Sequence, residues 1–261
     1  MNSGTNFIKT EFIFRKLYLR VSYMSELPTW EGFLPAMPAT VLKLLNVDQP
    51  STSPSPIEPV IQNFKEIKRV IMVVIDNLGL FEITYYKPEF LIQRASAFVL
   101  LSTKNPYTLG VFHQLLFGGF EPKGFHLLRK INEAGLNTSF IGRPKDVNRY
   151  NGGTNVIPKD SDMSTWIEAA KVINKNSLTL LHFLDFEKLH RQKRATPEEL
   201  IEKLIKRTDK WLLSIYKQMR SKSLMIIIGN HGRYRIDLEY SGKIAEWRKA
   251  SVPIAVMAYK P

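Results

Sequence analysis

The chain has 261 residues, of which 44% are hydrophobic, and it contains no cysteine. The lack of cysteine excludes disulfide bonds, thiolate metal sites and thiol catalysis. The formal net charge of +13 favours anionic partners, namely phosphorylated small molecules, nucleotides or nucleic acid, with lysines that coat solvated helix faces as the alternative explanation. No apolar run approaches the roughly 20 residues that a membrane span needs, so we expect no membrane span and a cytoplasmic protein.

The N-terminal residues 1–23 carry aromatic side chains interrupted by charged ones, without the unbroken apolar centre of a signal peptide. We expect translation to start at Met24 and residues 1–23 to be an artefact of start-site assignment or a loose arm. Residues 24–261 are expected to form a single α/β domain. A loop rich in Pro and Ser at 48–59 could serve as a linker. Residues 24–47 are too short to fold alone, so we expect them to pack on the main domain.

The most informative stretch is an unbroken apolar run in residues 69–75 that ends at Asp76. Such a run, mostly β-branched and without alternation, predicts a strand buried on both faces, as in a parallel or mixed sheet. A carboxylate at the carboxyl end of such a strand lies where open α/β sheets bind their ligands. Asp76 is therefore a candidate site residue, with a simple turn carboxylate as the alternative.

A second strand is predicted at 97–101, followed by a helix from Thr108 to Phe117 that Gly118-Gly119 ends. Thr108 would then lie at a helix N-terminus, where free N–H groups favour a bound anion. This makes Thr108 a candidate nucleophile, with an ordinary N-cap as the alternative. The following elements are predicted as a helix at 124–134, a strand at 138–141, a loop at 142–160 and a helix at 164–174.

Two more buried strands are predicted at 178–184, ending at Asp185, and at 224–228, leading into Asn230-His231. Three buried strands would therefore bring acid–base or metal-binding side chains to one edge of the sheet. The remaining predicted elements are a long helix beginning at Thr196-Pro197-Glu198-Glu199 and reaching about Arg220, a short helix at 244–249 and a final strand at 253–257. The alternation of strands and helices predicts a layered α/β/α sandwich with a mostly parallel central sheet.

Asp76 with His231, and Asp185 with His190, form two carboxylate–imidazole pairs. Oxygen and nitrogen ligands without thiolate suit zinc, manganese or iron. Two such ions roughly 3.5–4 Å apart would clamp the attacking and leaving oxygens of a phosphoryl transfer. For His190 a surface position is an equal alternative, because the basic run 191–194 follows it directly.

The order of these motifs resembles the alkaline phosphatase superfamily, and most closely its phosphodiesterase and nucleotide-pyrophosphatase branch. The resemblance covers about Lys68 to Pro261 and rests on Asp76-Asn77-Leu78-Gly79, on Asn105 to Phe125 around Thr108, on His182 to His190, and on Gly229-Asn230-His231-Gly232. It implies an alkaline-phosphatase-like fold and a metal-dependent phosphoric-ester hydrolase with Thr108 as the nucleophile. A phosphodiester or nucleotide is the implied substrate class.

The same resemblance implies the metal ligands. Asp76, Asn230 and His231 would hold one divalent ion, zinc or alternatively manganese, and Asp185 and His190 would hold a second. The chain departs from the family pattern in three respects: Asn230 stands where the family has Asp, His190 follows Asp185 by five residues instead of four, and Tyr240 stands at the late His. Because of these departures, the chain could bind two ions, one ion or none. The same departures motivate the alternative of a catalytically degenerate member that binds a nucleotide, nucleic acid or protein.

Overall fold

The computed structural model describes residues 27–105, 107–122, 124–190, 197–230 and 254–261. The predictions for residues 1–23, the start at Met24, His231, Tyr240 and the helix at 244–249 lie outside the described residues, as does the side chain of His190.

The described strands form one eight-stranded sheet in the order β1-β3-β8-β7-β2-β6-β4-β5. Every neighbouring pair is parallel except those of β8, which runs antiparallel to β3 and β7. The mostly parallel sheet predicted from the buried apolar runs is thereby confirmed. The strands are β1 (Thr29–Phe33), β2 (Arg69–Ile75), β3 (Ala97–Ser102), β4 (Thr138–Gly142), β5 (Asn155–Pro158), β6 (Leu178–Phe183), β7 (Ser223–Gly229) and β8 (Ile254–Lys260).

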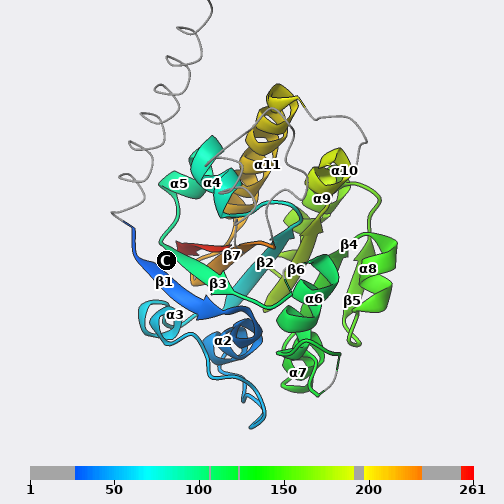
Figure 1. Ribbon diagram of the computed structural model, residues 1–261. Helices are drawn as coiled ribbons and strands as arrows, with labels where there is room; N and C mark the ends of the chain where they lie inside the picture. The colour runs from blue at the N-terminus through cyan, green and yellow to red at the C-terminus, as the bar shows by residue number, and fades with distance from the viewer. Residues whose placement is uncertain (1–26, 106, 123, 191–196, 231–253) are drawn as a thin grey trace, which may run out of the picture.

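Helices cover both faces of the sheet, which makes the fold an α/β/α sandwich (Figure 1). One layer consists of η1 (Leu34–Ala36), α2 (Met37–Leu44), α3 (Glu58–Asn63), α6 (Thr108–Phe117), α7 (Leu127–Glu133) and α8 (Pro144–Arg149). The other layer consists of α4 (Leu80–Tyr86), α5 (Glu89–Gln93), α9 (Asp162–Val172), α10 (Asp185–His190) and α11 (Glu198–Gln218).

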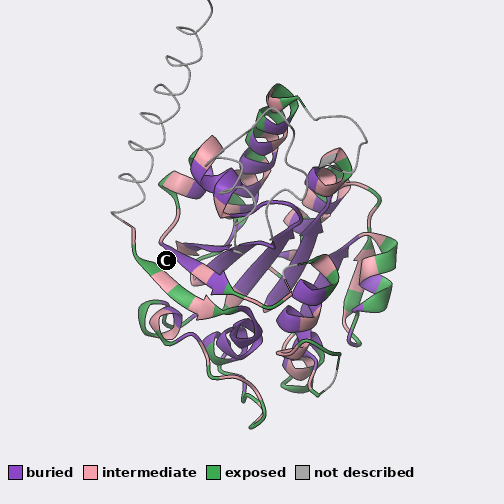
Figure 2. Cartoon of the chain, in the orientation of Figure 1, coloured by how far each residue is buried: buried purple, intermediate pink, exposed green. Residues whose placement is uncertain are grey.

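Two hydrophobic cores result, one on each face of the sheet. The side chains of β2 alternate between them, with Val70, Met72 and Val74 in one core and Ile71, Val73 and Ile75 in the other. The central strands are buried along most of their length (Figure 2). Burial on both faces explains why these strands are continuous apolar runs in the sequence.

The register of the central strands determines where the candidate site lies. Ile75 of β2 pairs with Phe183 of β6 on one side and with Gly229 of β7 on the other. The next residues, including Asp76 and Asn230, therefore lie at the same edge of the sheet, at the carboxyl ends of three adjacent parallel strands. Ligands of open α/β sheets bind at this kind of edge.

Some local predictions are wrong. Residues 142–160 do not form a loop but contain α8 and β5. β5 is a short edge strand whose residues are exposed or only partly buried, so it carries no apolar pattern. The long helix α11 begins at Glu198 with Pro197 as its N-cap residue, one position later than predicted, and the predicted N-cap Thr196 lies outside the described residues. β1, which we did not predict, pairs with β3 and is the edge strand at the end of the sheet opposite β5.

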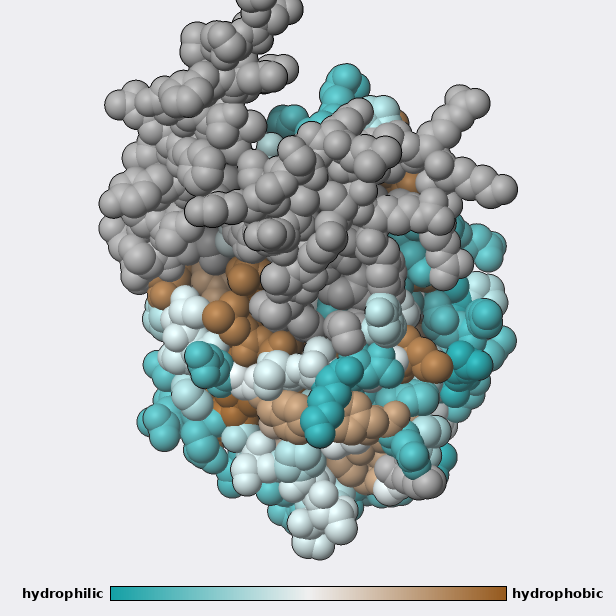
Figure 3. All heavy atoms as spheres, in the orientation of Figure 1, coloured by the Kyte–Doolittle hydropathy of each residue, from teal (hydrophilic) through white to brown (hydrophobic). Residues whose placement is uncertain are grey.

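The face visible in Figure 3 carries its hydrophobic side chains in small groups among hydrophilic ones. No helix within the described ranges is both long enough and apolar enough to cross a membrane.

Candidate active site

Asp76 is the centre of a buried hydrogen-bond network at the carboxyl edge of the sheet. The hydroxyl of Thr108, the first residue of α6, donates a hydrogen bond to Oδ2 of Asp76 at 3.0 Å. The side-chain amide of Asn230 donates to Oδ1 of Asp76 and lies 3.5 Å from Oγ1 of Thr108. Three residues predicted from different parts of the sequence therefore converge on one carboxylate. Thr108 does not cap its helix, because Tyr107 is the N-cap residue and makes no side-chain cap.

The backbone around this network is closely packed. Asn77 adopts a left-handed conformation with φ of 57°, and its N–H donates to Oδ1 of Asn230 at 3.0 Å. A Cβ on Gly229 would lie 1.8 Å from the carbonyl oxygen of Leu78. Only glycine therefore permits β7 to approach the turn after β2, and this approach brings Asn230 to Asp76.

A histidine that we did not single out in the sequence lies beneath this network. His182 of β6 is fully buried, with Nε2 at 3.5 Å from Oδ2 of Asp76 and Nδ1 at 3.1 Å from Oδ2 of Asp146. Burial alone would lower the pKa of His182, but the hydrogen bonds and charges of the two carboxylates outweigh it and raise the pKa to about 9. A histidine inside a six-residue buried strand was a usable signal, since a buried imidazole requires partners.

The turn before Thr108 is fixed by Gln114. Its Nε2 donates to the carbonyl oxygens of Asn105 and Gly110, each at 2.9 Å, and its Oε1 accepts from Thr103 at 2.6 Å. The side chain of Asn105 packs so closely against Gly110 that a Cβ there would come within 2.3 Å of it. The N-terminus of α6 is therefore held in a defined position relative to β3.

Asp185 lies in a separate group of charges. Its Oδ1 is 3.3 Å from Nη2 of Arg143 and its Oδ2 is 2.7 Å from Nη2 of Arg207. Arg143 also pairs with the buried Asp162 at 2.7 Å. Burial raises the pKa of Asp162, while backbone N–H groups of Leu184 and Asp185 and the charge of Arg143 act in the opposite direction.

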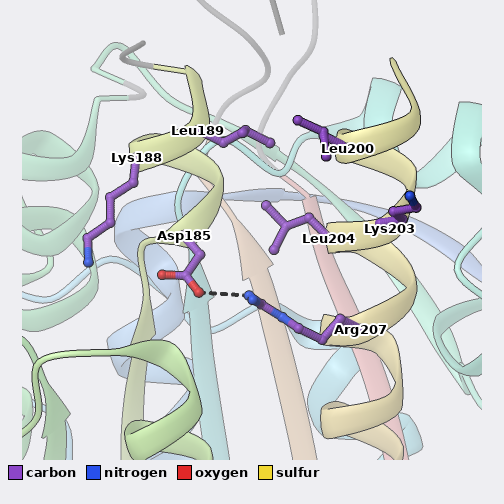
Figure 4. Close-up of a pocket in the computed structure, with 7 residues that line it drawn as sticks. All are labelled: Asp185, Lys188, Leu189, Leu200, Lys203, Leu204 and Arg207. Carbon is purple, nitrogen blue, oxygen red and sulfur yellow. Dashed lines mark hydrogen bonds and ion pairs between the residues drawn. The ribbon is translucent and has the colours of Figure 1, made fainter. Parts of the chain in front are cut away.

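Two cavities flank this second group. One, of about 390 Å³, lies between α10 and α11, where Figure 4 shows Asp185 and Arg207 pointing toward each other beside three leucines. The other has a volume of about 360 Å³ and contains the candidate nucleophile Thr108 in its wall. Its lining residues are Thr108, Leu109, Arg143, Lys145, Asp146, Arg149, Tyr150, His182, Leu184 and Glu187. Three cationic side chains and the candidate nucleophile therefore share one cavity.

The fold has counterparts among solved structures. The C-terminal periplasmic domain of EptC from Escherichia coli, solved in complex with zinc, matches with a TM-score of 0.52 and 13% identity over 76% of this chain and 74% of that one. A protein of the alkaline phosphatase superfamily from Vibrio parahaemolyticus matches with a TM-score of 0.50 and 12% identity over 87% of this chain and 68% of that one. The chain has the alkaline-phosphatase-like fold. At these identities the similarity concerns the fold alone, and no protein-family model and no curated protein matches the sequence.

On this alkaline-phosphatase-like fold, the predicted site residues separate into two groups. Thr108, Asp76 and Asn230 are in mutual contact, whereas Asp185 contacts arginines. His190 ends α10 with a side chain outside the described residues, and His231 lies outside them entirely. The residues that sequence reasoning missed are His182, Asp146, Arg143, Asp162 and Arg207.

The described residues do not fit a two-metal centre. Asn230 presents an N–H to Asp76 and its oxygen accepts from the N–H of Asn77, so the amide would have to turn over to offer its oxygen to an ion at Asp76. At Asp185, each carboxylate oxygen faces a guanidinium, so a divalent ion bound there would lie close to two positive charges. Within the described ranges, no three His, Cys, Asp or Glu side chains are grouped so that they could hold a metal ion.

Proposed function

We propose that the chain is a phosphoric-ester hydrolase, of the phosphodiesterase or phosphatase type, with Thr108 as its nucleophile. The observation that carries the proposal is the hydrogen bond from Thr108 to Asp76 at 3.0 Å, at the wall of the cavity lined by Arg143, Lys145 and Arg149. A carboxylate within this distance of a hydroxyl is positioned to take up its proton.

The proposed chemistry has two steps. As Oγ1 of Thr108 bonds to phosphorus, its proton moves to Asp76, and the bond from phosphorus to the leaving oxygen breaks. The leaving oxygen departs and takes up a proton from solvent where its basicity requires one. A water molecule then attacks the phosphothreonine and releases a proton to solvent, while the bond from phosphorus to Oγ1 breaks and Asp76 returns its proton to Thr108. Because attack and hydrolysis use the same pair of residues, one hydrogen bond serves both steps.

The surroundings of Thr108 favour an anionic substrate. Thr108 opens α6, a helix of ten residues, so the free N–H groups and the positive end of the helix dipole face the cavity. The cationic side chains of Arg143, Lys145 and Arg149 line the same space and outnumber its two carboxylates, Asp146 and Glu187. A phosphate group would therefore meet several donors and positive charges close to the nucleophile.

A divalent ion at Asp76 would be held by Asp76, by Asn230 with its oxygen turned toward the ion, and by His231. The steps above use only Thr108, Asp76 and water. Zinc or manganese at this position would stabilise charge on the phosphoryl oxygens.

The experiment compares Thr108→Val, which keeps the shape of the side chain and removes its hydroxyl, with Thr108→Ser and with the exposed control Thr29→Val. Turnover of bis(p-nitrophenyl) phosphate, p-nitrophenyl phosphate and a nucleotide p-nitrophenyl ester is measured. We expect loss of turnover in Thr108→Val, partial activity in Thr108→Ser, and phosphothreonine at position 108 by mass spectrometry after rapid acid quench. Full turnover in Thr108→Val would exclude this mechanism.

A second candidate function is a binding module for a nucleotide, nucleic acid or protein. The observation in its favour is that Asn230 and two arginines already satisfy the carboxylates that would hold metal ions. It predicts that the wild type binds nucleotides or oligonucleotides in a salt-sensitive manner without hydrolysing any of the three substrates. Thr108→Val would then bind as well as the wild type.

A further inference from the structure

Two ion pairs meet on the carboxylate of Asp185. Oδ1 faces Arg143 at 3.3 Å and Oδ2 faces Arg207 at 2.7 Å. Figure 4 shows the second pair, in which Asp185 from α10 and Arg207 from α11 point toward one another. Each carboxylate oxygen already faces a guanidinium, whose positive charge would oppose a cation bound there.

The two ion pairs form a bridge, Arg143–Asp185–Arg207, and Arg143 is held in this bridge by the buried Asp162. Asp162, whose side chain is 2% exposed, pairs with Arg143 at 2.7 Å. The same carboxylate accepts the backbone N–H groups of Leu184 at 2.9 Å and of Asp185 at 2.8 Å. Asp162 therefore fixes the guanidinium and the start of α10 together, so that Arg143 and Asp185 cannot separate without disturbing a buried group.

Arg207 is held from the other side by aromatic rings. Its guanidinium lies 4.3 Å from the ring centroid of Trp211, and Trp211 stacks on Trp166 with centroids 5.3 Å apart. A guanidinium is well suited to such stacking because it is planar and weakly hydrated. Both ends of the bridge are therefore positioned by the protein and not only by Asp185.

We propose that the Arg143–Asp185–Arg207 bridge takes the place of a second metal ion, so that the guanidinium of Arg143 supplies positive charge at the cavity that Thr108 lines, while Arg207 holds Asp185 from the neighbouring cavity. The role of Arg143 in catalysis rests on the proposed function. Arg143 lines the same cavity as Thr108, so its charge lies at the wall where the phosphoryl group of a monoester or diester would bind. Guanidinium groups recognise phosphate oxygens through paired N–H donors.

The first test counts metal ions. Protein prepared without affinity metals is stripped with a chelator, titrated calorimetrically with Zn²⁺ or Mn²⁺, dialysed and subjected to elemental analysis. We expect the wild type and Asp185→Asn to bind the same number of ions, none or one per chain, with affinities within about threefold of each other. Two ions in the wild type, or an ion whose affinity Asp185→Asn weakens more than about tenfold, would overturn the proposal.

A second measurement uses the wild type alone, because Asp185→Asn leaves two arginines without their carboxylate and could fail to fold. The Nε–H resonances of Arg143 and Arg207 are assigned by NMR with Arg→Lys variants and followed during Zn²⁺ titration. We expect both to stay unchanged at saturation. A large shift of both resonances would mean that a cation displaces the guanidinium groups, which contradicts the bridge.

The role of Arg143 in binding a phosphoryl group is tested by measuring the affinity for inorganic phosphate. Arg143→Lys keeps the charge and loses the paired donors, and Arg94→Lys is the exposed control. We expect the dissociation constant of inorganic phosphate to rise about tenfold in Arg143→Lys only. Unchanged affinity would overturn the role of Arg143. None of these measurements uses turnover, so a failure of the hydrolase proposal, seen with Thr108→Val, is distinguishable from a failure of this one.

Discussion

Nε2 of His182 lies 3.5 Å from Oδ2 of Asp76, the same oxygen that accepts the hydrogen bond of Thr108. The other ring nitrogen of His182 lies 3.1 Å from Asp146, at the edge of the cavity. One buried imidazole therefore connects the proposed nucleophile and its base to a second carboxylate. His182 is linked to Thr108 through Asp76, which makes it a positioning residue.

Replacing this imidazole is expected to destabilise the protein. His182→Phe keeps a ring but leaves the fully buried Asp76 without a cation partner. We expect the free energy of unfolding to fall by about 3–5 kcal/mol, which is the usual effect of removing one partner of a buried ion pair. Urea denaturation measures the loss. The control is His113→Phe on α6, where the histidine is only partly buried, and an equal loss in both variants would contradict the role given to His182.

The exposed cations of the cavity should affect substrate binding and leave the fold unchanged. Lys145 and Arg149 are exposed residues of α8 that line the cavity with Thr108. We expect Lys145→Gln and Arg149→Gln each to raise KM for a phosphodiester about three- to tenfold with little change in kcat, because each loses one charge–phosphate contact of about 1 kcal/mol. Steady-state kinetics measure this. Lys171→Gln, exposed at 61% on α9, should leave KM unchanged.

The parts of the site that the sequence predicted are those that follow buried strands. The apolar run of β2 predicted both the strand and the position of Asp76, and the run of β7 did the same for Asn230. Parallel neighbours end at one edge, so their convergence required no knowledge of helix packing. Thr108 was predicted from the helix signals at 108–117 and from the resemblance to the superfamily.

The second group of charges was not predictable in this way. Arg143 follows β4, Asp162 begins α9 and Arg207 lies on α11, so their meeting depends on how two helices pack on the sheet. Each residue taken alone is an ordinary charged residue. The edge strands β1 and β5 were missed for a related reason, since half-exposed strands give no apolar run.

The close approach of β7 to the turn after β2 should be sensitive to a single methyl group. In Gly229→Ala the new Cβ would lie 1.8 Å from the carbonyl oxygen of Leu78. We expect a loss of more than about 3 kcal/mol in the free energy of unfolding, because backbone must move to relieve the overlap. Where folded protein is obtained, turnover should also fall, since Asn230 moves relative to Asp76. Gly119→Ala is the control, because its Cβ would meet no atom within 4 Å.

His126 gives the protein a predicted sensitivity to acid. Burial lowers the pKa of His126 to about 4, and neither ring nitrogen makes a hydrogen bond to a described residue. An unfolded histidine has a pKa of about 6.5, so the unfolded chain binds more protons between about pH 6.5 and 4. The free energy of unfolding should therefore fall as pH decreases through this window, by at most about 3 kcal/mol from this residue.

His126→Phe should remove that part of the acid sensitivity. The ring packs edge-on against Phe117 with centroids 4.9 Å apart, so phenylalanine can replace it without loss of contact. Denaturation curves at pH 7.5 and pH 4.5 give the free energy of unfolding that is lost between these two pH values in the wild type, in His126→Phe and in the control His113→Phe. We expect this loss to be about 2–3 kcal/mol smaller in His126→Phe only. If the three proteins lose equal stability on acidification, the buried imidazole of His126 is not the group that takes up the proton.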